Sequence, residues 1–207
     1  TEDPDDGDIF DDGAELIPAD DEANPTGRPG VTLSSQTFIP PYLWVANHTD
    51  NTMTRIHTER NAEEGRYWVA ENPSRTAVDL DGNVWVAGRS DGRLTKVLWD
   101  PESCPDRNGN GIIDTSRPGN LGPLNSPADP FLDECVVFSQ VMRAETPTIR
   151  GIAAGPDGRV WIGYSTGGVQ WIDPNTLEIG DYVSSEGAPV FAPGPDGVYA
   201  PVWEADG

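Results

Sequence analysis

The residues best suited to chemistry lie in a short run between the only two cysteines of the chain, Cys104 and Cys135. Carboxylate and amide side chains alternate there with other residues, at Asp106, Asn108, Asn110 and Asp114. Oxygen ligands at such positions can converge on one hard cation. The run therefore predicts a structural calcium site. A flexible, oxygen-rich loop suits calcium better than magnesium.

The order of these residues follows the loop of an EF-hand for most of its length. The acidic and amide residues take the first, third, fifth and ninth positions, the ninth directly or through a water molecule. Gly111 takes the sharp bend, Ile112 offers its backbone carbonyl, and Ile113 is the apolar anchor that pins the loop to the core. The alternative is an Asn- and Gly-rich turn that binds no metal.

The twelfth position departs from the pattern, because Arg117 stands where an acidic bidentate ligand is usual. The missing ligand must come from elsewhere, and Asp133 and Glu134, beside Cys135, are the candidates. The sequence does not choose between them. A Cys104–Cys135 disulfide would bring both back to the loop.

Such a disulfide would place the protein in an oxidising compartment. We therefore expect a secreted or cell-envelope protein. Two buried free thiols are the alternative, because free cysteine is often buried.

Charge and composition exclude several classes of function. The formal net charge is -22, which argues against nucleic acid and anionic membrane surfaces as partners, since both attract basic patches. No apolar run of about 18 residues occurs, so no membrane-spanning helix is expected. Residues 1–30 are rich in aspartate and proline, and we expect a disordered acidic tail or linker there.

A repeat begins after residue 31. The Leu-Trp-Val-Ala run at residues 43–46 recurs as Val-Trp-Val-Ala at 84–87 and Val-Trp-Ile-Gly at 160–163, with a weaker copy at 198–200. Trp44 and Trp85 are 41 residues apart, whereas Trp85 and Trp161 are 76 apart. One period plus an insertion explains the longer spacing, and the calcium loop, within residues 100–140, accounts for it. Periods near 40 residues are typical of propeller blades.

Each repeat has strand and turn signals. Asp-Gly, a strong hairpin signal, precedes the aromatic strand at residues 81–82, 157–158 and 196–197. Alternating strands then follow at 94–97 and 169–172, with 53–56 in the same role in the first copy. The repeated tryptophans are expected to form the blade core.

Residues 73–97 and 151–182 resemble blades of the NHL-type or streptogramin-lyase-like β-propellers. The Cys-Pro-Asp-Arg-Asn-Gly-Asn-Gly insertion resembles one in secreted bacterial, particularly myxobacterial, members of that group. The resemblance implies an all-β fold, a partial propeller of about three to four blades over residues 31–207. Such rings close with more blades, so the chain is either a fragment or is completed by a protein partner or by its own copies.

Arg75 and Arg150 lie on strands that should line the central channel. They could bind an anionic ligand at the channel mouth. The alternative, which we favour, is that they pair with local carboxylates. They sit one place apart relative to their Asp-Gly turns, so the sequence does not make them strictly equivalent.

Three functions remain open. We favour an extracellular, calcium-stabilised binding or scaffold module, because no acid–base set carries a recognisable local motif. A propeller lyase or hydrolase of the streptogramin-lyase type is the second hypothesis, although its histidine, glutamate and magnesium arrangement matches no position here. The third is a self-assembling structural protein joined through open blade edges. Fold alone does not choose among them.

Overall fold

A computed structural model describes residues 40–143 and 148–184 of the chain. The chain divides into two units, Thr1–Ile39 and Pro40–Gly207. The first unit contains the predicted acidic tail, which lies outside the described residues. The weaker repeat copy at residues 198–200 and the Asp-Gly pair at 196–197 lie outside them as well.

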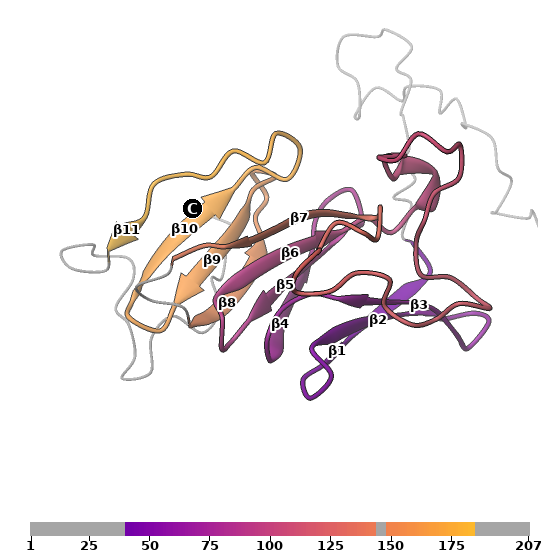
Figure 1. The fold of residues 1–207 in the computed structure, drawn as a ribbon. Helices are drawn as coiled ribbons and strands as arrows, with labels where there is room; N and C mark the ends of the chain where they lie inside the picture. The colour runs from indigo at the N-terminus through magenta and orange to yellow at the C-terminus, as the bar shows by residue number, and fades with distance from the viewer. Residues whose placement is uncertain (1–39, 144–147, 185–207) are drawn as a thin grey trace, which may run out of the picture. The chain divides into compact units, whose positions relative to one another are not determined.

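The described residues form three antiparallel sheets and one short 3₁₀ helix (Figure 1). The first sheet contains β1 (Tyr42–Asn47), β2 (Thr52–His57) and β3 (Ala62–Trp68). The second contains β4 (Pro73–Val78), β5 (Val84–Gly88), β6 (Arg93–Val97) and β7 (Val136–Val141). The third contains β8 (Ile149–Ala154), β9 (Val160–Tyr164), β10 (Gly168–Ile172) and β11 (Val183–Ser184). The helix η1 (Pro101–Ser103) follows β6.

Strand order follows chain order in every sheet, so each sheet is a meander. The predicted Asp-Gly turns join β4 to β5 and β8 to β9. In both turns the glycine has a positive φ, 85° at Gly82 and 80° at Gly158, which a residue with a side chain rarely adopts. The same backbone hydrogen bonds close both turns, from Gly82 N to Asp79 O and from Gly158 N to Gly155 O. Turn chemistry predicted from sequence therefore sets the strand boundaries.

The three repeated tryptophans occupy equivalent positions, on β1, β5 and β9. Side chains alternate between the two faces of a strand. Trp44 packs against the core shared by the first and second sheets, and Trp85 lies in the core shared by the second and third. Each of these two tryptophans thus faces the sheet that follows its own in sequence.

The opposite face of the same strands packs on the preceding sheet. Val84 and Val86 of β5 are fully buried with Met53 and Tyr67 of the first sheet. Val160 and Ile162 of β9 are fully buried against the second sheet, in the cluster that contains Trp85. The second sheet is consequently buried on both faces.

Two buried cations join consecutive sheets in the same way. Arg55 of β2 lies across from Trp44 in the strand register and donates from Nη1 to the carbonyl of Trp99 at 2.7 Å. Lys96 of β6 lies across from Trp85 and donates from Nζ to the carbonyl of Pro174 at 2.8 Å. Each acceptor is two residues beyond the third strand of the following blade. Trp171 of β10 replaces the cation in the third sheet, across from Trp161.

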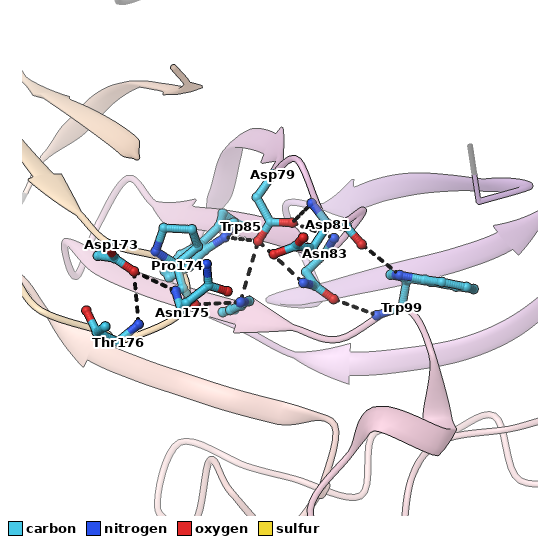
Figure 2. A network of polar contacts seen from close by, with 10 residues as sticks. Asp79, Asp81, Asn83, Trp85, Trp99, Asp173, Pro174, Asn175 and Thr176 are labelled. Carbon is cyan, nitrogen blue, oxygen red and sulfur yellow. Dashed lines mark hydrogen bonds and ion pairs between the residues drawn. The ribbon is translucent and has the colours of Figure 1, made fainter. Parts of the chain in front are cut away.

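Asp79 completes the buried network around Lys96 (Figure 2). Its carboxylate accepts hydrogen bonds from the backbone of Asp81 and Asn83 and from Trp85 Nε1 at 2.9 Å, and lies 3.5 Å from Lys96 Nζ. Both charged side chains are almost fully buried, and the cation offsets the cost of burying the anion.

The equivalence of β1 with β5 and β9 makes the first sheet one strand short. β4 and β8 are the first strands of their blades, and among the described residues the first sheet has no counterpart to them. The fold class expected from the sequence is confirmed: the chain is all-β, a partial propeller built of consecutive meander blades, with an insertion between β6 and β7.

Candidate calcium loop

The insertion between β6 and β7 is closed by a disulfide at its base. Cys104 and Cys135 are bonded, with their Cα atoms 4.9 Å apart and a sequence separation of 31. Both cysteines belong to the core between the first and second sheets. The predicted disulfide is present, and it fixes both ends of the insertion to the blade.

Asp106 organises the first half of the loop. Its Oδ1 accepts hydrogen bonds from the backbone nitrogens of Gly109 at 2.7 Å and Asn110 at 3.2 Å, and its Oδ2 accepts one from Gly111 at 2.8 Å. Gly111 has a φ of 79°, so the predicted bend lies at this glycine. The chain therefore wraps around the Asp106 carboxylate.

The side chains at the third and fifth loop positions both contact one carboxylate oxygen of the ninth. Asn108 Nδ2 and Asn110 Nδ2 donate to Asp114 Oδ2 at 2.8 and 3.1 Å. The amide oxygens accept from the chain itself, Asn108 Oδ1 from Asn110 N and Asn110 Oδ1 from Ile112 N. Three of the candidate ligand residues are thus joined by side-chain hydrogen bonds.

The two isoleucines of the loop, Ile112 and Ile113, differ in burial. Ile113 is partly buried against the core between the first and second sheets, so it anchors the loop. Ile112 keeps its side chain 55% exposed. The backbone nitrogen of Ile112 donates to Asn110 Oδ1. The Ile112 carbonyl as a calcium ligand stays a prediction.

Glu134 reaches the loop from the other side. Its Oε1 accepts hydrogen bonds from Arg107 N at 2.7 Å and Asn108 N at 3.3 Å, and its Oε2 accepts one from Asp114 N at 2.8 Å. The buried Glu134 carboxylate therefore joins the start of the loop to its end. The acidic ligand at the twelfth position of an EF-hand loop has a similar role. Arg117, which stands at that position, instead pairs through its backbone with Asn120.

Asp133 points elsewhere. Its two oxygens accept from Thr115 Oγ1, Cys135 N and Ser116 N at 2.8, 3.0 and 2.8 Å. The residue is fully buried, and burial raises the pKa of the Asp133 carboxyl above its ordinary value. The two acidic neighbours therefore have different hydrogen-bond partners, and only Glu134 contacts the loop residues 106–114.

Arg107 is part of this arrangement, although sequence reasoning gave it no role. Its guanidinium donates to the carbonyls of Val136 at 2.8 Å and Glu134 at 3.1 Å, and it lies over the Phe131 ring. Its position after the first loop residue carries no ligand signal. The contact spans nearly thirty residues, which is why local spacing did not indicate it.

The donor set around Asp106 and Asp114 is made only of oxygen and amide groups. Among the described residues no three histidine, cysteine, aspartate or glutamate side chains gather as a metal-binding group, so any site here also uses amide and carbonyl oxygens. Such mixed oxygen sets suit calcium and not zinc. The residue types fit calcium, provided that the two asparagine amides rotate to present oxygen instead of nitrogen.

Arg75 and Arg150, the two arginines expected at the channel mouth, are joined by a hydrogen bond from a side chain to a backbone carbonyl. Arg75 Nε donates to the carbonyl of Arg150 at 2.7 Å and Nη1 donates to that of Ser74 at 2.8 Å. The strand registers pair Arg75 with Ala87 and Gly151 with Gly163, with an irregularity at the same place in both sheets. Arg150 falls at that irregularity, so the two arginines are not equivalent. Arg75 joins the first strands of neighbouring blades.

Comparisons with known proteins find similar folds at low identity. No family model matches the chain, and no curated protein matches it. Hydrazine synthase from Kuenenia stuttgartiensis is 14% identical over 70% of this chain and 33% of that one, with a TM-score of 0.47. Virginiamycin B lyase from Staphylococcus aureus is 14% identical over 72% and 39%, with a TM-score of 0.42. The WD40 repeats of RRP9 are 10% identical over 79% and 39%, with a TM-score of 0.48.

The chain spans less than half the length of each of these proteins. At this level of similarity nothing about their activities is transferred to it. Of the helices that the structure describes, none has the length and apolar character needed to cross a membrane.

Proposed function

We propose that this chain is part of an extracellular, calcium-stabilised β-propeller that acts as a binding or scaffold module. One observation carries the proposal: inside a disulfide-closed insertion, residues 109–111 wrap around the Asp106 carboxylate, and Asn108 and Asn110 both contact Asp114 Oδ2. The resemblance of residues 73–97 and 151–182 to NHL-type blades is consistent with it.

In this proposal the side chains of the four loop residues and the Ile112 carbonyl hold the ion. Glu134 is the acidic residue that takes the place of the twelfth-position ligand, because its carboxylate already bridges the two ends of the loop. Asp133 has no ligand role in this proposal, because its hydrogen bonds go to Thr115, Ser116 and Cys135 and to no residue of the 106–114 loop. Bound calcium would offset the mutual repulsion of these carboxylates and stiffen the insertion.

The disulfide supports the proposed location. A bond of this kind persists in oxidising compartments, so we infer a secreted or cell-envelope protein.

The partner of the module is another blade, supplied by a protein partner or by a further copy. Val84 and Val86 are equivalent to Leu43 and Val45, one residue to either side of the repeated tryptophan. The valines of the second sheet are fully buried by the first sheet, whereas Leu43 and Val45 are 54% and 36% exposed. The first sheet thus carries the apolar face that a preceding blade covers in the rest of the fold.

Calcium titration by calorimetry tests the metal site directly. We expect the wild-type chain, first stripped with EDTA, to bind about one calcium ion, and Asp106→Ala to lose the binding because it removes both a ligand and the centre of the loop. Asp173→Ala, which removes a partly exposed aspartate from another blade, is the matched control and should bind like the wild type. Absence of binding by the wild type would refute the calcium proposal.

A further inference from the structure

The calcium loop contains the only two asparagine–glycine steps of the sequence, Asn108–Gly109 and Asn110–Gly111. In such a step the glycine nitrogen can attack the side-chain carbonyl carbon of the asparagine. A C–N bond forms, the bond to the amide nitrogen breaks, and ammonia leaves with the proton of the backbone nitrogen. Water then opens the succinimide ring to give aspartate or isoaspartate. Glycine favours the reaction because it has no Cβ to obstruct ring closure.

Solvent reaches both steps. All four residues are exposed. A Cβ built on Gly109 or Gly111 would meet no atom within 4 Å, so no neighbouring segment covers the reacting groups. Water, the second reactant, has free access to the loop.

The fold nevertheless engages both attacking nitrogens with a single carboxylate. Gly109 N donates to Asp106 Oδ1 at 2.7 Å, and Gly111 N donates to Asp106 Oδ2 at 2.8 Å. The nitrogen becomes a nucleophile only after it loses its proton. A neighbouring negative charge disfavours that loss, because it would place two negative charges side by side.

The side chains under attack are held as well. Each asparagine Oδ1 accepts from the backbone nitrogen two residues on, and each Nδ2 donates to Asp114. Closing either ring requires breaking one glycine bond to Asp106 and reorienting one amide.

We propose that Asn108 and Asn110 are deamidation sites, and that Asp106 keeps them in the amide form while the loop is folded. The sequence supplies two reactive steps, and the structure supplies one residue that protects both. The two products have different effects. Aspartate adds a charged oxygen ligand to the loop, whereas isoaspartate adds a carbon to the backbone and alters the ligand spacing. Only these consequences, and not the reaction, rest on the proposed calcium function.

The test follows deamidation by peptide mass spectrometry in the full-length, disulfide-bonded chain, incubated at mildly alkaline pH in EDTA. Asp106→Ala should accelerate the reaction at both asparagines by at least about tenfold, the equivalent of losing one hydrogen bond to a charged group. Asp106→Asn keeps only one carbonyl oxygen, so it should accelerate one site more than the other. Equal rates in the wild type and Asp106→Ala would overturn the proposal.

Ile113→Ala is the control for general loosening of the loop. It removes the apolar anchor and leaves Asp106 and its three hydrogen bonds in place. We expect it to deamidate at the wild-type rate. If it reacts as fast as Asp106→Ala, loop mobility rather than Asp106 controls the reaction, and the proposal is wrong. Because EDTA is present throughout, failure of this test is distinct from failure of calcium binding.

Discussion

Tyr67 illustrates how burial of a single residue makes stability depend on pH. It lies fully buried in the core between the first and second sheets, and its hydroxyl approaches Gly65 so closely that a Cβ there would lie 2.6 Å from it. Burial raises the pKa of Tyr67 from 10.0 to about 12. A pKa raised by folding means that the stability from the neutral phenol is fully present below pH 10 and is lost as the pH rises through about 12.

We therefore predict that Tyr67→Phe resists alkali better than the wild type. At about pH 11 the wild type should have lost about 1 kcal/mol through this group, and the variant none. Urea unfolding of both proteins at about pH 8 and about pH 11 measures the difference, and the other titrating groups are common to both. The prediction fails if the gap between the two proteins does not change with pH.

At the scale of elements, the buried cations make polar contacts between consecutive blades, in addition to the apolar clusters. Arg55 and Lys96 occupy equivalent positions and reach equivalent carbonyls, those of Trp99 and Pro174. Lys96 also compensates the buried carboxylate of Asp79. Arginine makes this contact in one blade and lysine makes it in the next. A long, positively charged side chain is therefore sufficient, whether it ends in a guanidinium or an ammonium group.

Lys96→Met should lower the free energy of unfolding by about 3 kcal/mol, because Asp79 then stays buried without its cation. Lys96→Arg is the matched control and should retain most of the stability, since Arg55 makes the same contact one blade earlier. Urea unfolding at neutral pH compares the three proteins. A methionine variant as stable as the wild type, or an arginine variant as weak as the methionine one, would contradict this role.

The strands were predictable from sequence, whereas the contacts between blades were not. The tryptophan period and the Asp-Gly turns are local signals, and they placed β1, β5 and β9 in equivalent positions. The Lys96–Pro174 bond joins residues 78 apart, and no spacing rule indicates it. Arg75 donates to the carbonyls of Ser74 and Arg150, bonds that the sequence did not predict because every residue offers a backbone carbonyl.

The disulfide and the anchoring of the loop were predictable to the same degree, whereas its calcium ligands stay a prediction. The alternation of acidic and amide residues identified the loop, and the apolar spacing identified Ile113 as its anchor. The choice between Asp133 and Glu134 depends on which way two adjacent side chains turn from one strand end. That choice is made by tertiary partners such as Thr115 and Asp114, so one sequence does not contain it.

Among the described residues of the whole molecule, the first sheet carries an apolar face that no other sheet covers. Leu43 and Val45 are exposed, whereas the residues at the equivalent positions of the second and third blades are fully buried. We predict that the chain associates at high concentration through this face, because burying it removes apolar area from water.

Sedimentation analysis across a range of concentrations measures this association. Leu43→Ser with Val45→Ser should weaken it without lowering the melting temperature, since both side chains are already exposed. Leu80→Ser, at a residue 73% exposed in a turn, is the control and should associate like the wild type. A chain that stays strictly monomeric at high concentration contradicts association with a further copy through this face, and leaves a different protein as the source of the blade.

The central claim is that calcium holds the 106–114 loop, and thermal melting with and without EDTA tests it most directly. A ligand that binds only the folded chain raises the melting temperature. We predict that calcium raises the melting temperature of the wild type and leaves Asp106→Ala with Asp114→Ala unchanged, so that the two proteins differ in calcium and nearly coincide in EDTA. The same difference between the two proteins in both conditions would contradict the account.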